Sequence, residues 1–200
     1  MSCVAIAASQ KVERIAVAPA AGLSDSLRQA LEEKGYRVTL EDRWTAEFWF
    51  AKQIATQDKE VPGALYPKFL NSAFVGIVRL PQGMSDYRGQ SIPAGTYTLR
   101  YELLPQDGNH MGVAPNPDFL LASPVTDDSR PEQKYLPRKL VALSAKSTGT
   151  GHPAVIAMEA AGEPGTVVKQ DDGTIVFTAE LPMAGAKQRT GIVIKGTAAQ

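Results

Sequence analysis

The sequence predicts a mainly β fold, an antiparallel β-sandwich of the immunoglobulin-like or jelly-roll type with one or two short helices. Apolar and polar residues alternate in many short runs, as they do on strands with one buried face. The 17 glycines and 14 prolines separate these runs rather than forming one tract. Helical segments are few and do not alternate with strands as a doubly wound parallel sheet requires. A closed barrel is the structural alternative, because alternation does not fix strand order.

The clearest strand is expected over Gly95–Leu104, where the alternation is unbroken. Its two faces carry Tyr97, Leu99, Tyr101 and Leu103 on one side and Thr96, Thr98, Arg100 and Glu102 on the other. The preceding Pro93-Ala94-Gly95 supplies a turn, because proline presets φ and glycine tolerates φ > 0. The other predicted strands are Val12–Val17, Tyr36–Glu41, Thr45–Ile54, Phe74–Leu80, Asp118–Ala122, Ala154–Glu159, Thr166–Lys169, Thr174–Leu181 and Gly191–Lys195.

A tight hairpin is expected at Asp171-Asp172-Gly173, which separates the predicted strands Thr166–Lys169 and Thr174–Leu181. Asp-Gly readily adopts the positive φ angles that short hairpin turns need. These two strands are therefore predicted to pair with each other.

Two segments follow helical spacing, and both helices are expected at the edges or ends of the sheets. The first is Leu23–Lys34, with Ser24 as the N-cap and Gly35 as the residue after the C-terminus. The second is Pro137–Lys146, which has proline in its first turn. The apolar sides of these two helices consist of Leu23, Leu27, Ala30 and Leu31 in the first and Leu136, Leu140 and Leu143 in the second.

Composition excludes several classes of partner. The chain has 21 Lys plus Arg and 21 Asp plus Glu, a net charge of zero, so it lacks the basic surface of a general nucleic-acid binder or a polybasic membrane binder. No apolar run approaches the roughly 18 residues that a spanning helix needs, and no transmembrane segment is expected. The single cysteine, Cys3, allows neither an intramolecular disulfide nor a cysteine-based metal cluster.

One domain is expected over residues 11–200, because 200 residues are close to the length of a single large domain. Residues 1–10 are interpreted separately. Cys3–Ala8 is small and apolar, with Ala5 and Ala7 in the spacing found at the end of secretory signal peptides. The alternatives are a leader remnant, a frayed terminus and the opening of a first strand.

Two stretches of the chain have distinctive motifs. Ser85–Pro124 contains DYRGQ, PAGTYTLRY, PQDGNHMG and DFLLASP, and Ser147–Val155 reads STGTGHPAV. Together they resemble a family of uncharacterised bacterial proteins that are mainly exported and rich in β-structure, and the resemblance extends over most of the chain. It implies a periplasmic or secreted location and a β-sandwich. It implies no activity, ligand or catalytic residue.

Standard catalytic motifs are absent. The sequence has no Gly-x-Ser-x-Gly elbow, no Walker loop, no dinucleotide fingerprint after a strand and no His-Glu-x-x-His. We therefore assign no catalytic residue and no cofactor, and a binding role is favoured over an enzyme. Any function is expected in the long connections 56–71, 81–94 and 105–117.

The only two histidines stand in glycine-bounded loops. His110 follows Asp107, Gly108 and Asn109, and His152 lies between Gly151 and Pro153. If the loops converge, the two imidazoles with Asp107 and Asn109 could bind a ligand, an anion or a metal, and Asp107 or Asp118 could supply a carboxylate oxygen to a metal site. The favoured interpretation is structural, because loop histidines commonly donate a hydrogen bond to a carbonyl and lock a turn.

The aromatic run Trp44–Phe50 suggests a second candidate ligand site. Alternation places Trp44, Ala46, Phe48 and Phe50 on one face, which must be core. Trp49 lies on the opposite, mixed face, where an exposed indole could stack on a sugar ring. The favoured interpretation is that both faces are covered, one by the opposing sheet and one by the helix Leu23–Lys34.

Two function classes remain. The first is a non-catalytic exported binding or interaction module with a protein or polysaccharide partner. The second is an enzyme or a metal- or ligand-binding protein that uses the loops of His110 and His152. A deep pocket lined by both histidines and a carboxylate would favour the second class, whereas an exposed aromatic surface would favour the first.

Overall fold

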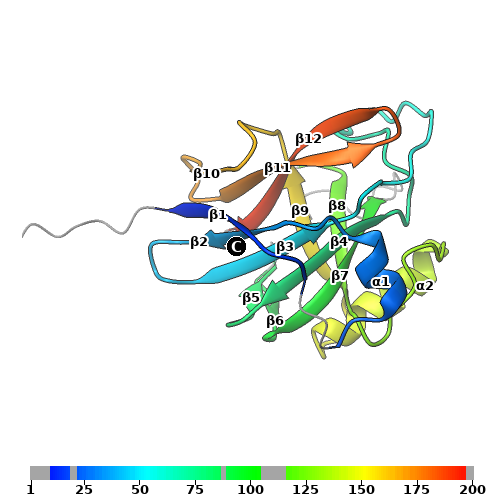
Figure 1. Cartoon of the computed structure of the whole chain (residues 1–200), viewed down its shortest axis with the longest axis horizontal. Coiled ribbons are helices and arrows are strands. Elements are labelled where there is room, and N and C mark those ends of the chain that lie inside the picture. Colours follow the sequence, from blue (N-terminus) through cyan, green and yellow to red (C-terminus); the bar gives the residue numbers. More distant parts are fainter. Residues whose placement is uncertain (1–9, 19–21, 87–88, 105–115, 197–200) are drawn as a thin grey trace, which may run out of the picture.

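The computed structural model describes residues 10–18, 22–86, 89–104 and 116–196 (Figure 1). The strands in this part of the chain are β1 (Lys11–Ile15), β2 (Gly35–Thr39), β3 (Thr45–Phe50), β4 (Phe74–Leu80), β5 (Met84–Ser85), β6 (Ser91–Ile92), β7 (Gly95–Leu103), β8 (Asp118–Pro124), β9 (Ala154–Glu159), β10 (Thr166–Lys169), β11 (Ile175–Met183) and β12 (Ala186–Lys195). The helices are α1 (Asp25–Ala30), α2 (Pro137–Ser144) and the short 3-10 helix η1 (Ala145–Ser147).

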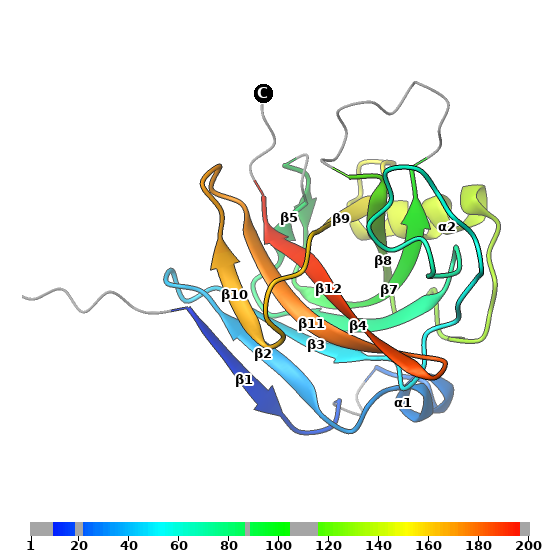
Figure 2. The same ribbon diagram turned by 90° about the horizontal axis from the view of Figure 1, so that it is seen from above.

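Ten strands form one sheet in the order β1-β2-β3-β4-β7-β8-β9-β12-β11-β10, and every neighbouring pair is antiparallel. The prediction of a mainly antiparallel β fold is confirmed. The sheet curls until its outer strands, β1 and β10, contact each other (Figure 2). The result is a nearly closed barrel rather than clearly two stacked sheets, because hydrogen bonding continues from strand to strand without a break.

Aromatic side chains fill the interior. Phe48 and Phe50 of β3 face inward, and both ring centroids lie close to that of Phe177 of β11, at 5.3 and 6.5 Å. Tyr36 of β2 meets Phe177 edge to face at 5.4 Å. These contacts join strands from opposite sides of the sheet, and buried aromatic pairs of this kind stabilise a core beyond their buried area.

The segment between β3 and β4 ties the two halves of the sheet together at one end of the barrel. The Tyr66 hydroxyl donates to the Glu159 carbonyl at the end of β9 and accepts from the Gly191 N–H of β12 at 2.9 Å. The buried carboxylate of Asp118 accepts from the N–H groups of Leu65 and Tyr66 and from the Tyr101 hydroxyl, at 2.7–2.9 Å. These bonds hold a long connection in one place.

The β5–β6 hairpin projects at the opposite end of the barrel. It is inserted between β4 and β7, where the sequence predicted only a loop, and it contacts β12 across the opening. Ile92 of β6 is fully buried in the core cluster. The hairpin therefore closes this end and forms the framework of the site described below.

Strand prediction was most accurate for three of the strands. The observed β4, β9 and β10 have the predicted bounds, and the Asp171-Asp172-Gly173 hairpin is confirmed, with Gly173 at φ 89°. β3 ends at Phe50, before the predicted Ile54, because the chain then leaves β4: the Lys52 N–H donates to the Ala30 carbonyl and the Ile54 N–H to the Pro182 carbonyl. β12 begins at Ala186, earlier than predicted, since polar Lys187–Arg189 continue the pairing with β11.

Helix α1 is shorter than the predicted Leu23–Lys34. Ser24 caps it as expected, accepting from the Leu27 N–H at 3.2 Å. The helix stops at Ala30 because the chain then joins the sheet: Leu31 bridges Ala51. Gly35 opens β2 instead of terminating the helix, and a Cβ there would lie 2.6 Å from the indole nitrogen of Trp49.

Helix α2 packs on β8 and buries Leu140 and Leu143 as predicted, whereas Leu136 is 79% exposed. Leu136 lies at the N-cap, outside the helical turn that contacts the sheet. Within the described part of the chain, neither helix has the length and apolar character needed to cross a membrane.

A buried ion pair lies on the outer face of β7. The Arg100 guanidinium, 1% exposed, donates from Nε and Nη2 to the carboxylate of Asp128, which is fully buried, at 2.6 and 2.9 Å. Its other donors reach the carbonyls of Ser72, Gln133 and Arg130, each at 2.8 Å. One side chain therefore anchors the 128–133 segment to the sheet with all five N–H groups bonded.

We predict that Asp128→Asn destabilises the fold by about 3–5 kcal/mol, because removing one partner of a buried pair leaves the other charge uncompensated. Urea unfolding followed by circular dichroism measures the change. Lys187→Gln is the matched control, since it removes an exposed ion pair with Glu180, and its unfolding midpoint should stay near that of the unaltered protein. Equal stability of Asp128→Asn and the control would contradict the anchoring role.

Candidate functional site

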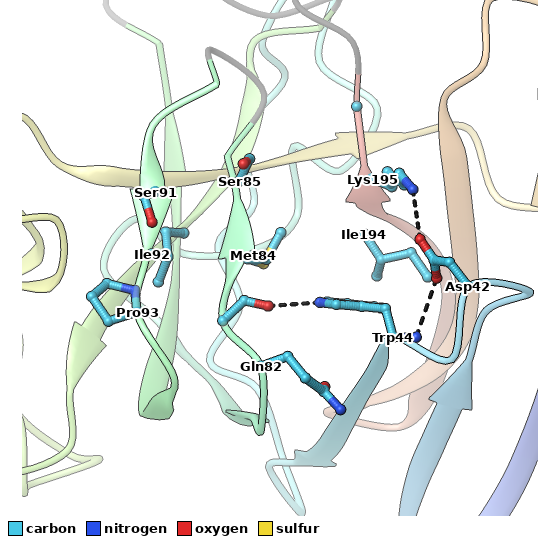
Figure 3. Close-up of a pocket in the computed structure, with 12 residues that line it drawn as sticks. Asp42, Trp44, Gln82, Met84, Ser85, Ser91, Ile92, Pro93, Ile194 and Lys195 are labelled. Atoms are coloured by element: carbon cyan, nitrogen blue, oxygen red, sulfur yellow. Dashed lines mark hydrogen bonds and ion pairs between the residues drawn. The ribbon is translucent and has the colours of Figure 1, made fainter.

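A pocket of about 470 Å³ lies beside the β5–β6 hairpin (Figure 3). Three elements meet there: the turn between β2 and β3, the hairpin, and the end of β12. The lining residues are Asp42, Trp44, Gln82, Gly83, Met84, Ser85, Ser91, Ile92, Pro93, Ile194, Lys195 and Gly196. We call this cavity the Trp44 pocket.

Trp44 is held in place at both its main chain and its ring. The indole N–H donates to the Gly83 carbonyl at 2.6 Å, which links the start of β3 to the hairpin. Gly83 has φ 72°, and a Cβ there would lie 2.5 Å from the Ile92 carbonyl oxygen, so only glycine fits. The Trp44 N–H donates to Asp42 Oδ1 at 3.1 Å. The ring is therefore preorganised before any ligand arrives.

The indole is half-buried and has apolar walls beside it. Figure 3 shows the ring edge-on, with Met84 of β5 and Ile194 of β12 on one side and Gln82 on the other. Gln82 turns its amide oxygen toward Thr45, which donates to it from the main chain and the hydroxyl at 3.2 and 3.1 Å. One face of the indole ring is thus directed toward the part of the pocket that lies between the hairpin and β12.

Charge at the rim is balanced. Lys195 Nζ lies 2.9 Å from Asp42 Oδ2, and both side chains are exposed. The hydrogen bond from Lys195, helped by the Trp44 N–H, holds the pKa of Asp42 below its ordinary value, so this group is a carboxylate at neutral pH. Ser85 and Ser91 add exposed hydroxyls. The arrangement offers hydrogen bonds around an aromatic surface, without an activated nucleophile among its lining residues.

Trp49, the aromatic candidate from the sequence, is 2% exposed, and its indole N–H donates to the Ala16 carbonyl at 2.8 Å. It therefore presents no exposed ring on which a sugar could stack, which corrects its candidacy. The favoured interpretation, that both faces of this strand are covered, is confirmed for Trp49. The indole N–H of Trp49 is bonded to Ala16 in the segment that follows β1, and not to a residue of the predicted helix Leu23–Lys34.

Of the histidine loops, only the one with His152 lies in the described residues; His110, Asp107 and Asn109 lie outside them. His152 is exposed, and its loop is held internally: Thr148 Oγ1 donates to the His152 carbonyl at 2.7 Å. Thr150 Oγ1 donates to Gln90 of the hairpin loop at 2.8 Å. No group of three or more His, Cys, Asp or Glu in the described ranges is arranged to hold a metal ion.

The sequence pattern placed Trp44 on the core face, and Trp44 does pack against the core cluster, but it is only partly buried. Its place at the start of the strand, next to a turn, was the sequence feature that could have indicated this partial exposure. Trp44 is the first residue after the tight Asp42-Arg43 turn, in which Arg43 has φ 64°. A side chain at the end of an inward-facing row lies at the barrel rim, where it is only partly covered.

A second unusual group lies outside the pocket. Glu102, on the outer face of β7, is 4% exposed, and its Oε2 accepts from Asn71 Nδ2 at 3.2 Å. Its Oε1 is buried and has no hydrogen-bond partner among the residues that the structure describes. Burial raises the pKa of Glu102 to about 7 against the pull of the nearby Leu103 and Ser72 N–H groups. The native state thus holds a proton here that the unfolded chain releases at lower pH.

Comparisons with protein-family models, with curated proteins and with solved structures found no match to this chain.

We predict that Glu102→Gln removes a pH dependence of stability. The raised pKa means that stability is fully present below pH 4.5 and is lost as the pH rises through about 7. At about 1.4 kcal/mol per pKa unit, the difference between 4.5 and about 7 corresponds to a loss of roughly 3.5 kcal/mol that is nearly complete by pH 8. Urea unfolding should show that the free energy of unfolding of the variant, relative to that of the unaltered protein, is higher at pH 8 than at pH 5. An equal difference at both pH values would contradict a buried, protonated Glu102.

We also predict that the two tryptophans differ in solvent access. Trp49→Phe leaves Trp44 as the remaining indole, and Trp44→Phe leaves Trp49. Acrylamide should quench the emission of the first variant with a steeper slope than that of the second, because Trp44 lines an open pocket and Trp49 is covered. Equal slopes would show that the Trp44 ring is sealed from solvent.

Proposed function

We propose that the protein is a non-catalytic, exported binding module whose ligand rests on Trp44. The observation that carries this proposal is the half-buried indole of Trp44, which lines a pocket of about 470 Å³ beside hydroxyl, amide, carboxylate and ammonium groups. The indole N–H is bonded to the Gly83 carbonyl, and the main-chain N–H of the same residue is bonded to Asp42. Ligand sites typically combine an apolar or aromatic surface with a few placed polar groups. The resemblance to exported β-rich proteins supports the export part of the proposal.

The surrounding structure favours binding over chemistry. The two ionisable side chains among the described lining residues, Asp42 and Lys195, are paired with each other, and the hydrogen bond from Lys195 stabilises the carboxylate form of Asp42. A general base needs a pKa near the working pH, whereas the pKa of Asp42 is lowered. These groups are therefore suited to hold a polar ligand rather than to move its protons.

The test is a ligand screen with Trp44 as the reporter. Sugars, amino acids, short peptides, nucleotides and small aromatic acids are screened by thermal shift with the full chain, and hits are titrated by tryptophan fluorescence. We expect the fluorescence change caused by a true ligand to persist in Trp49→Phe, and the thermal shift that this ligand causes to be reduced in Trp44→Phe. A screen without any saturable hit, or hits that act equally on both variants, would overturn the proposal.

A further inference from the structure

The chemistry of the Trp44 pocket narrows the class of ligand, an inference that rests on the proposed function. The indole face carries partial negative charge, and it attracts flat surfaces made of weakly positive C–H groups. Met84 and Ile194 flank that face and add dispersion contacts without charge. The floor of the pocket therefore matches a ring that is apolar on its face and polar around its edge.

The rim supplies hydrogen bonds in both directions. Each Asp42 carboxylate oxygen already accepts one bond, from the Trp44 N–H or from Lys195, and keeps further lone pairs for a ligand. Lys195 has three donors, of which Asp42 uses one. Ser85 and Ser91 can donate and accept. Groups of this kind bind hydroxyls, which also act as both donors and acceptors.

The balance of charge argues against an ionised ligand. Asp42 and Lys195 neutralise each other across 2.9 Å. An anionic ligand would meet the Asp42 carboxylate, and a cationic one would meet the Lys195 ammonium, so either would have to weaken the existing pair. A neutral polyhydroxylated ring can bond to both groups and leave the pair intact.

From this we propose that the Trp44 pocket binds a neutral hexopyranose unit of a glycan, with the C–H face of the sugar on the Trp44 indole and its hydroxyls on Asp42, Lys195 and the two serines. The pocket has room for such a ring at about 470 Å³. Its exposed rim residues, Ser85, Ser91 and Lys195, leave the site open to solvent, so the sugar can remain part of a longer chain.

The experiment is calorimetric and fluorescence titration of the full chain with matched sugars: glucose, galactose and mannose, their disaccharides, and the charged analogues glucuronic acid and glucosamine. We expect saturable binding of at least one neutral sugar, with its charged analogues weaker. Trp44→Ala should weaken binding about tenfold or more, as loss of an aromatic contact does, and Trp44→Phe should retain part of it. Asp42→Asn should weaken it by a smaller factor.

Two further variants test whether a loss of binding comes from the pocket itself rather than from misfolding or from a change in charge elsewhere. Ser85→Arg fills the pocket from an exposed position without removing a core contact, so it should abolish binding in a protein whose circular dichroism is unchanged. Lys187→Gln alters a charge in an exposed ion pair outside the pocket and should bind as the unaltered protein does.

The outcomes separate the two proposals. Neutral sugar binding that Trp44→Ala and Ser85→Arg both abolish supports the inference. Binding of another ligand class at Trp44, with no response to neutral sugars, overturns the sugar inference and leaves the proposed function standing. Sugar binding that neither variant changes overturns the site. Failure of every ligand class overturns both proposals.

Discussion

The curvature of one continuous antiparallel sheet is the constraint on which the remaining structure depends. The ten-stranded sheet must curve far enough to bring its end strands, β1 and β10, into contact. As end strands, β1 and β10 each have one edge outside the strand pairing of the sheet. Arg14 of β1 is exposed and pairs in register with Tyr36 of β2, with its guanidinium 4.0 Å from the ring centroid. Charged side chains on an edge strand discourage pairing with another chain.

Curvature also creates two ends that must be covered, and the chain covers them differently. Tyr66 and Asp118 fasten one end with hydrogen bonds between a long connection and β8, β9 and β12. At the other end a two-stranded hairpin reaches β12, and contact between them is limited to a few residues. The Trp44 pocket lies where the hairpin and β12 diverge. The site lies at the margin of the core: Ile92 and Ile194 line the pocket and belong to the core cluster, whereas Phe48, Phe50 and Phe177 belong to that cluster without lining the pocket.

Local pattern predicted strands well because short apolar or β-branched runs bounded by turn residues are typical of strands, and β4, β9 and β10 have the predicted bounds. It could not predict the partner of each strand. The polar row Thr98, Arg100 and Glu102 illustrates the limit: the faces were assigned correctly, yet all three side chains are buried. Arg100 is covered because Asp128, far along the chain, supplies a carboxylate. A buried charge is tolerated only with such a partner, and single-sequence periodicity contains no information on that pairing.

The candidate site shows the same limit at the scale of one side chain. Trp44 and Trp49 belong to one strand region and to opposite faces. The polar neighbours Thr45 and Glu47 make Trp49 the candidate for an exposed ring, although the favoured interpretation is that both faces are covered. In the structure Glu47 is buried between Arg37 and Arg79, and Trp49 lies over Gly35 beneath the chain that follows β1. Exposure depends on which segment crosses a face, whereas periodicity reports only which residues share it. Trp44 is accessible because the barrel ends there, and that position is set by the turn at Asp42-Arg43 rather than by the pattern of the strand.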